Sequence, residues 1–256
     1  LLRGKEGHHA IDKEANANAL EMFDKAIDSD PNNAQAYAWK ACTMGQAFGR
    51  GWIQKPLEEV MPEFNKLMDH ALKADPNDFE LHRLLCGIST MTGKLKVAVE
   101  HGKKAYDMVP NDPRILQQYG EILLKTGKTR QGCDLTLLAL EYDPVAQGQI
   151  NSDKRKSDAV FGCLMDDRVE LGLEIAEEIE ACAENTLLFS AALSVAKHGS
   201  LEPYTWLVND LKKSNFQGLE AAIEEMGKYD VVVQSTLREV YLDHIAKLQP
   251  NLQLVS

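Results

Sequence analysis

The motif ADPND at residues 74–78 returns along the chain as VPND at 109–112 and as YDP at 142–144. The prolines of these copies are 34 residues apart in both steps, and a fourth copy, SDPNN at 29–33, has its proline 45 residues before that of ADPND. Equal steps with a shared local motif indicate an internal repeat. A unit of about 34 residues is too short to bury an apolar face alone, so such units must stack on one another.

Three positions of each unit carry small side chains when the motif proline is numbered 32. They are Ala41, Cys86 and Gly120 at position 8, Ala19, Ala98 and Gly132 at position 20, and Ala26, Ala71, Ala105 and Ala139 at position 27. Small side chains let two helix axes approach to about 8 Å. The pattern therefore predicts two closely crossing helices in each unit.

Gly93 and Gly127 each follow a predicted helix, where a residue in the left-handed conformation commonly ends it. In its length, its small positions and these turns, the repeat resembles the tetratricopeptide repeat (TPR) family. The resemblance covers residues 1–146. It implies an all-α fold, a right-handed α-solenoid of antiparallel helix pairs.

Three regions are expected along the chain. Residues 1–146 form the tetratricopeptide-like region, with an insertion at about 45–56 because one step is 45 rather than 34 residues long. Residues 147–158 are polar and are expected to form a loop. Residues 159–256 keep the helical spacing of apolar residues without the repeat motif, so we expect divergent helical repeats that end in a capping helix.

Apolar periodicity and helix-stop residues define the expected helices. These span residues 15–28, 34–47, 62–74, 79–91, 94–108, 113–125, 129–141, 159–165, 171–182, 187–197, 203–213, 216–227 and 231–248. A short helix is expected at PLEEVM (56–61), and Pro62 is expected in the first turn of the next helix, where proline is tolerated. The first residues are expected to be the end of a helix whose start is missing, which suggests a cut inside a longer protein.

Composition and charge exclude several classes of function. The formal net charge is −11 with no dense basic cluster, which argues against a nucleic acid partner and against an anionic membrane surface. No run of 18 apolar residues could span a membrane. The five cysteines are odd in number and form no CxxC motif, so we expect free thiols in a reducing, cytoplasmic setting.

Catalytic and metal-binding patterns are weak. His82 and Cys86 lie four residues apart on one predicted helix, a spacing that could place two metal ligands on one face, but Cys86 also occupies a small repeat position, which explains it without a metal. Gly49 and Gly51 lack the strand, helix and Lys-Ser/Thr of a phosphate loop. We therefore expect no enzyme activity and no cofactor or metal. A hidden enzyme in residues 159–256 would need clustered, buried titratable groups.

The resemblance also implies a partner-binding surface, since the first helix of each pair lines the concave groove in this family. The expected partner-binding residues at matching positions are Gln35, Cys42, Gln46, Arg83, Arg114, Gln117, Glu121 and Lys125. The basic and Asn clamp with which chaperone-binding members hold a C-terminal carboxylate is not reproduced here. The surface suits a protein or peptide partner, although simple solvation of these residues is an equal alternative.

The insertion supplies a second candidate surface, because Phe48, Arg50 and Trp52 are residue types common at binding hot spots. Packing of Trp52 back onto the solenoid is the favoured alternative. If the insertion were instead a lid, the chain would be a ligand-sensing domain for a small molecule or signal peptide. That alternative requires a deep pocket near residues 45–56.

The expected function is a protein–protein interaction scaffold or regulatory module. Residues 1–45, which include LLRG and ALEMFDKAIDSDPNNAQAYAWKA, also resemble the repeat region that follows the catalytic domain in bacterial class III adenylate cyclases. That resemblance implies a regulatory part of a larger bacterial signalling protein. Nothing in the chain resembles the metal-binding aspartate pair of a cyclase.

Overall fold

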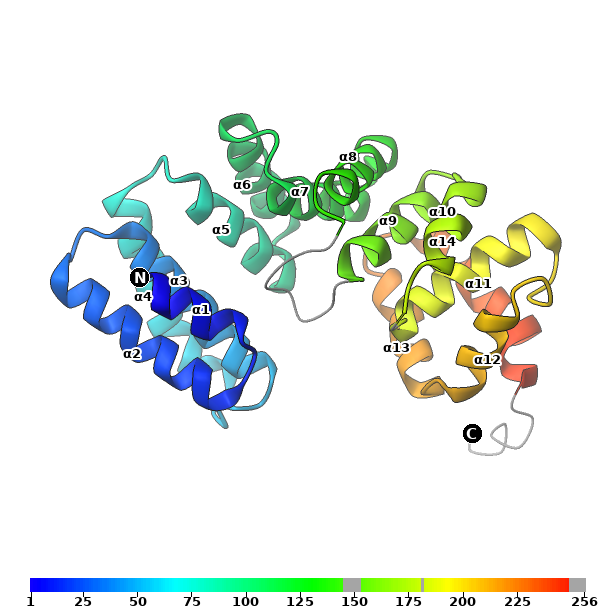
Figure 1. Cartoon of the computed structure of the whole chain (residues 1–256), viewed down its shortest axis with the longest axis horizontal. Coiled ribbons are helices and arrows are strands. Elements are labelled where there is room, and N and C mark those ends of the chain that lie inside the picture. Colours follow the sequence, from blue (N-terminus) through cyan, green and yellow to red (C-terminus); the bar gives the residue numbers. More distant parts are fainter. Residues whose placement is uncertain (145–152, 181, 249–256) are drawn as a thin grey trace. The chain divides into compact units, whose positions relative to one another are not determined.

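The computed structural model describes residues 1–144, 153–180 and 182–248. Throughout these residues the regular elements are helices (Figure 1), and the all-α, tetratricopeptide-like solenoid class expected from the repeat is confirmed. The chain divides into two compact units. We call residues 1–111 the N-terminal unit, and the described residues from Asp112 onward, 112–144, 153–180 and 182–248, the C-terminal unit.

The N-terminal unit consists of three helix pairs. Its helices are α1 (Leu2–His9), α2 (Lys13–Ser29), α3 (Ala34–Gly49), α4 (Leu57–Ala74), α5 (Phe79–Met91) and α6 (Leu95–Met108). Each first helix packs on the second helix of its pair, α1 on α2, α3 on α4 and α5 on α6. The core between them is built on large side chains such as Phe23, Trp39 and Leu81, which are almost fully buried.

The residues of the repeat motif form the turn between one helix and the next. In ADPND, Asp75 Oδ1 accepts a hydrogen bond of 2.9 Å from the backbone N–H of Asn77 and so stabilises the turn. Asp78 Oδ1 accepts one of 2.7 Å from Leu81 N–H and caps α5. The caps satisfy N–H groups that have no partner within the helix, and Pro76 cannot continue the preceding helix. The motif therefore ends one helix and begins the next.

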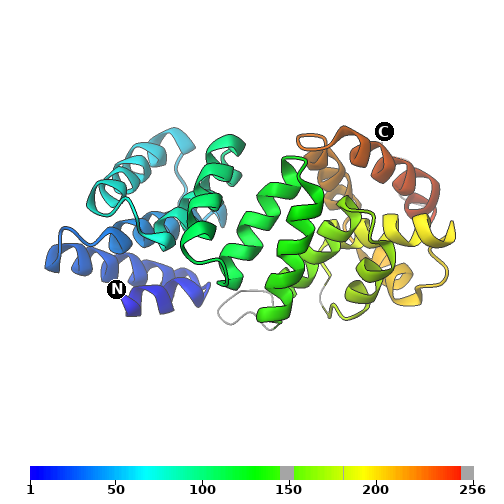
Figure 2. The same ribbon diagram turned by 90° about the horizontal axis from the view of Figure 1, so that it is seen from above.

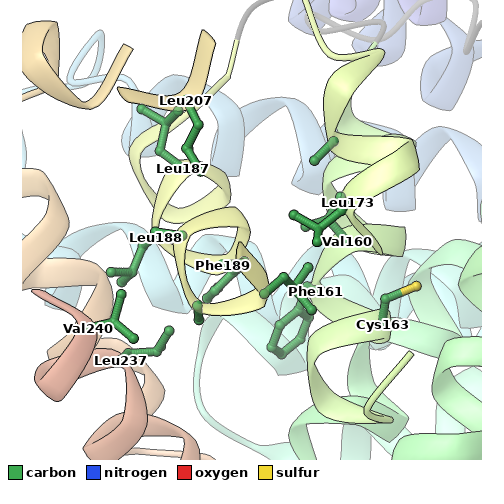
Figure 3. Close-up of a cluster of buried hydrophobic side chains, with 14 of the residues drawn as sticks. Val160, Phe161, Cys163, Leu173, Leu187, Leu188, Phe189, Leu207, Leu237 and Val240 are labelled. Atoms are coloured by element: carbon green, nitrogen blue, oxygen red, sulfur yellow. The ribbon is translucent and has the colours of Figure 1, made fainter. Parts of the chain in front are cut away.

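The C-terminal unit continues the helical arrangement. Its helices are α7 (Pro113–Lys125), α8 (Thr129–Tyr142), α9 (Lys154–Met165), α10 (Val169–Glu177), α11 (Glu184–His198), α12 (Thr205–Lys213), α13 (Phe216–Met226) and α14 (Val231–Val240), which runs on into a π-helical turn (Tyr241–Ile245) and a 3₁₀ turn (Ala246–Leu248). Figure 3 shows how α11 occupies the centre of this unit, with Leu188 directed toward Leu237 and Val240 of α14 and Phe189 toward Phe161 of α9.

The close helix crossing predicted by the small positions is present in the pair α7 and α8, which lie side by side in Figure 2. A Cβ atom added to Gly132 would lie 2.8 Å from Gly120 O and 2.7 Å from Leu124 Cγ. Ala98, Ala105 and Ala139 are also completely buried. Gly93 (φ +71°) and Gly127 (φ +82°) end their helices in the left-handed conformation, as the sequence predicted.

Several helix boundaries differ from the prediction. The two helices expected on either side of Pro62 are one continuous helix, α4, because this proline removes only one backbone hydrogen bond near the helix start. Helix α3 continues to Gly49, so the first residues of the expected 45–56 insertion are helical. Helix α9 begins at Lys154, within the segment 147–158 that was expected to be a loop, whereas 147–152 lie outside the described residues.

The end of α10 is a further difference, since it stops at Glu177 rather than Cys182. Along the chain, the division between the two units falls between Asn111 and Asp112. The sequence placed the change of repeat type later, near residue 146. That division into a repeat region, a loop and divergent repeats concerns the repeat pattern, and it stays a prediction.

Replacing Gly132 with Ala should destabilise the C-terminal unit by about 1–3 kcal/mol, because the added Cβ meets backbone atoms that cannot move independently. Urea unfolding followed by circular dichroism would measure the change. Gly49→Ala is the control, since a Cβ there meets nothing within 4 Å. Equal stability of Gly132→Ala and the wild type would contradict the close crossing of α7 and α8.

Candidate functional site

A pocket of about 250 Å³ opens in the C-terminal unit, and we call it the inner pocket. Helices α7, α9 and α11 form most of its wall, and α13 with the turn that follows it closes the remaining side. Its charged and polar lining residues are Glu121, Lys125, Lys154, Ser157, Asp158, Asn185, Thr186, Glu225 and Tyr229, and its apolar ones are Phe161, Ala183, Phe189, Ala222 and Met226.

The charged side chains of α7 and α9 are paired within the pocket wall. Lys125 Nζ lies 2.8 Å from Glu121 Oε1, and Lys154 Nζ lies 2.5 Å from Asp158 Oδ1. Both pairs join residues one helical turn apart, where side chains share a face. Gln117 Nε2 donates a hydrogen bond of 2.5 Å to the second carboxylate oxygen of Asp158. These two helices therefore contribute two positive and two negative charges to the wall, and the further lining carboxylate, Glu225 of α13, pairs with Lys228.

The pKa shifts of these groups follow from burial and from their partners. Burial alone would raise the pKa of Glu121, but Lys154 and Lys125 outweigh it and lower the pKa. Burial would lower the pKa of both lysines, yet Glu121 raises that of Lys125 and Asp158 raises that of Lys154. The pKa of Asp158 is raised by burial and by Glu121, against the opposing effect of Lys154. The two ammonium groups therefore keep their protons at neutral pH.

Tyr229 joins the charged wall to the turn after α13. Lys125 Nζ lies 4.8 Å from the centre of the Tyr229 ring, within the range of a cation–π contact. The Tyr229 hydroxyl donates a hydrogen bond of 2.8 Å to Glu225, which also pairs with Lys228 at 2.5 Å. The face of Tyr229 that could attract a ligand cation is thus already in contact with a cation of the protein.

The apolar part of the lining centres on two aromatic rings. Phe161 of α9 and Phe189 of α11 stack with centroids 5.2 Å apart and ring planes 29° from parallel. Met226 and Ala222 of α13 complete this lining. An uncharged ring or aliphatic group of a ligand could make dispersion contacts with all four side chains.

The expected partner-binding residues of the N-terminal unit lie in a hydrogen-bond network with α1 and α2. Gln35 accepts a hydrogen bond of 2.9 Å from Lys5 Nζ and donates one of 2.8 Å to Asp78. Gln46 donates to the carbonyl oxygen of His8 (3.2 Å) and accepts from Asn16 Nδ2 (2.7 Å). A partner that engaged these amides would have to replace internal hydrogen bonds.

Arg83 and Cys42 lie in the same region. The Arg83 guanidinium pairs with Glu80 at 2.9 Å, a carboxylate with 3% side-chain exposure, and lies 5.8 Å from the Trp39 ring. Burial raises the pKa of the Cys42 thiol to about 11, and Cys182 of the C-terminal unit is shifted in the same way to about 12. These thiols are therefore protonated at neutral pH and are poor nucleophiles.

The other expected partner-binding residues belong to α7. Glu121 and Lys125 line the inner pocket. Gln117 is buried behind it, where its amide orients Asp158 and accepts a hydrogen bond of 3.2 Å from Arg155. Arg114 is 43% exposed and pairs with Asp112 at 2.6 Å. The structure thus brings Gln117, Glu121 and Lys125 together, and a partner contact by any of the eight residues stays a prediction.

The insertion residues divide between packing and exposure. Phe48 packs against the core of the N-terminal unit. Trp52 is half-buried, and its backbone N–H donates a hydrogen bond of 2.8 Å to Ala47 O. The exposed Arg50 lies with its guanidinium carbon 5.5 Å from the Trp52 ring. A role of these three residues in binding stays a prediction.

Sequence reasoning missed most of the inner pocket. Lys154 and Asp158 were assigned to a loop, and Phe161, Phe189 and Tyr229 lie beyond the last repeat motif. A signal was present, because Lys154, Asp158 and Phe161 are spaced by four and three residues, the spacing of one helix face. This signal was not used because residues 154–158 were predicted to form a loop, whereas they are helical.

Across residues 1–144, 153–180 and 182–248, no three His, Cys, Asp or Glu side chains are grouped so that they could hold a metal ion. Within the same residues, no helix combines the length and apolar character that crossing a membrane requires.

Comparisons with known proteins identify the fold. No protein-family model matches the sequence, and a search of curated protein sequences also finds no match. The structure is similar to that of Pseudomonas aeruginosa pilF, with 11% identity, a TM-score of 0.57, and coverage of 94% of this chain and 97% of that one. A chain of the APC/C hetero-tetramer Cut9–Hcn1 is also similar, with 11% identity and a TM-score of 0.57 over 89% of this chain and 40% of that one. PilF and Cut9 are tetratricopeptide repeat proteins.

The chain has a tetratricopeptide-like fold. At 11% identity these similarities concern the fold alone. The tetratricopeptide resemblance is therefore confirmed at the level of architecture. The comparisons provide no test of the resemblance to the repeat region of adenylate cyclases, which stays a hypothesis.

The N-terminal unit should lose stability as the pH falls from about 6.5 to about 4. Burial, and then the neighbouring His9, lower the pKa of His8 to about 4, and burial with His82 does the same for His101. The folded state keeps these rings neutral while the unfolded chain takes up protons near pH 6.5, so stability is present above that pH and is lost below it. We expect a loss of roughly 1–3 kcal/mol, allowing for partial exposure.

Melting temperatures measured between pH 7.5 and 4.5 would test this expectation. His8→Asn should show a shallower dependence on pH than the wild type, because one of the histidines is gone. The same dependence in the variant and the wild type would show that His8 takes up its proton without cost in the folded state.

Proposed function

We propose that this chain is a protein–protein interaction module that binds a segment of a partner protein, with the inner pocket as the principal contact site. The observation that carries the proposal is that α7, α9 and α11, the first helices of successive pairs, together present one lined pocket. Solenoids of helix pairs create their binding surfaces from repeated elements in this way. Aromatic side chains next to ordered polar groups are the usual composition of such contact sites.

The chemistry of the pocket favours binding over catalysis. Its two lysines are each engaged by a carboxylate, and their raised pKa values keep them protonated at neutral pH. Neither amine therefore supplies the neutral form that a nucleophile or a general base requires. This supports a module that holds a ligand through contacts and orientation.

A second candidate function is the sensing of a small ligand. It is favoured by the pocket volume of about 250 Å³, which matches a group of amino-acid size rather than a long groove. The pocket belongs to the C-terminal unit, whereas the insertion with Trp52 belongs to the N-terminal unit.

The cellular setting of this function remains a hypothesis from the sequence. A regulatory role in a bacterial signalling protein would follow from the resemblance of residues 1–45 to the repeat region of class III adenylate cyclases. The free cysteines agree with a reducing, cytoplasmic location.

Capture from an extract of the source cells, quantified by mass spectrometry, would test the proposal. We expect a partner that is retained by the wild type and by Ala221→Trp and is lost from Ala222→Trp. The two alanines are adjacent on α13, but Ala222 lines the inner pocket and Ala221 lies outside it. The indole added by Ala222→Trp fills the inner pocket, whereas the indole added by Ala221→Trp does not.

A partner retained equally by both variants would place binding elsewhere on the chain. If no protein were enriched by the wild type over an unrelated helical control protein, the interaction function itself would be contradicted. A thermal-shift screen of small metabolites would then test the sensing alternative.

A further inference from the structure

We propose that the inner pocket selects an uncharged aromatic side chain of the partner, carried on a segment whose neighbouring residues are basic. This inference rests on the proposed function, since it assumes that the occupant is a protein segment. It adds the chemistry of the residue that enters the pocket and the sign of the charge beside it. Both features follow from how charge is distributed inside the pocket and around it.

The interior of the pocket favours an uncharged group. Lys125 and Lys154 each lie within 3 Å of a carboxylate, and Glu121 lies close enough to both lysines for them to lower its pKa. A positive side chain entering here would face two ammonium groups, and a negative one would face the carboxylates of Glu121, Asp158 and Glu225. Either would also lose its water, and a buried charge without its own partner is strongly disfavoured. An uncharged side chain leaves both pairs intact.

The apolar lining favours a ring. Phe161 and Phe189 offer two stacked aromatic surfaces, and Met226 adds a thioether that adapts to an entering ring. Offset or edge-to-face contact between rings contributes about 0.5–1.5 kcal/mol beyond the burial of apolar area. The volume of about 250 Å³ is enough for one large side chain.

The ring of Tyr229 does not make the pocket favour a positively charged side chain of the partner. Its ring is already within cation–π distance of Lys125 Nζ. A lysine or arginine of the partner would have to displace this internal cation. The exchange would bring no net gain, because one cation–π contact replaces another.

The surroundings of the pocket favour basic neighbours on the partner segment. Residues 112–256 contain 23 Asp and Glu against 14 Lys and Arg, a formal net charge of −9 out of −11 for the whole chain. At the pocket itself, Glu184 lies between the lining residues Ala183 and Asn185, and Glu225 is a lining residue that pairs with Lys228 at 2.5 Å. The excess of acidic residues is a property of the whole unit, in which Glu178 and Glu224 pair with Lys156 and Arg238.

Charge of this sign attracts basic segments and accelerates their association at low salt. The attraction acts on residues at the rim, which stay in water, and not on the group that enters the pocket. The paired charges of the pocket and the net negative charge of the unit around it therefore make different demands on one segment. The first selects the anchor residue and the second selects its neighbours.

Selection from a displayed library of random 12-residue peptides would test this inference with the full chain. We expect the enriched peptides to share one Trp, Phe or Tyr flanked by Lys or Arg. Binding of a synthetic copy, followed by fluorescence anisotropy, should weaken by about tenfold or more on Ala222→Trp and on raising the salt from 50 to 500 mM, and it should be unchanged on Ala221→Trp.

Lys154→Met provides a second variant that alters the charge of the pocket without filling it. Removal of this ammonium group leaves Asp158 without its lysine while Glu121 keeps Lys125, an excess of one carboxylate. We therefore expect a peptide with Lys in place of the aromatic anchor to gain affinity by about tenfold relative to the wild-type chain. Circular dichroism and melting temperature would establish that both pocket variants are folded.

Three results would overturn the inference. They are enrichment of peptides with a charged residue at the shared anchor position, enrichment of acidic neighbours, and absence of any enrichment over an unrelated control protein. None of them decides the interaction function, because capture of a natural partner tests that function with different molecules. Conversely, if no natural partner were captured but the expected peptides were enriched, the interaction function would be contradicted while the chemical preference of the pocket would stand.

Discussion

The capping residue two positions after the repeat proline, Asn33, Asp78 or Asp112, determines where the first helix of the next pair begins. Asp78 caps α5 and Asp112 caps α7 through hydrogen bonds from backbone N–H groups that would otherwise lack a partner. A helix pair of about 34 residues cannot bury its apolar face alone, so its start determines which residues reach the neighbouring pair. The small residues of the repeat then have to lie where the two helices of a pair cross. Gly120 and Gly132 meet this requirement at the most closely packed crossing described above.

The same constraint places the pocket. Once α7 begins at Pro113, Glu121 and Lys125 must lie on one face near its end, and the neighbouring first helix brings Lys154 and Asp158 beside them. Each ion pair is formed within one helix, so its geometry depends on local structure and little on long-range packing. The aromatic part depends on packing, since Phe161 and Phe189 come from different helices. The pocket therefore combines a locally determined charged wall with an apolar lining that exists only when the pairs stack.

The sequence predicts the fold wherever a cap or a stop residue marks a helix. The predicted boundaries 79–91 and 113–125 agree with α5 and α7, because an aspartate cap begins each helix and a glycine follows its end. Prediction fails where these marks mislead. Pro62 suggests a helix start but lies inside α4, and the polar residues before Ala159 suggest a loop although α9 has already begun. The pocket could not be predicted from the sequence for a related reason. Tyr229 approaches Lys125 through the tertiary fold, and no spacing in the sequence encodes that approach.

The burial of the thiols has a practical consequence for labelling. Cys86, Cys133 and Cys163 are buried, so although a hydrogen bond with Cys163 lowers the pKa of Cys133, its sulfur is not accessible to a reagent. The pKa values of Cys42 and Cys182 are raised to about 11 and about 12. At neutral pH a thiol with such a pKa is ionised in only about one molecule in ten thousand, and reagents such as maleimides react with the thiolate. A single cysteine introduced on the exposed surface would therefore react far ahead of the native ones. The wild-type background is thus suited to attaching a dye or spin label at one chosen position, without first removing its own cysteines.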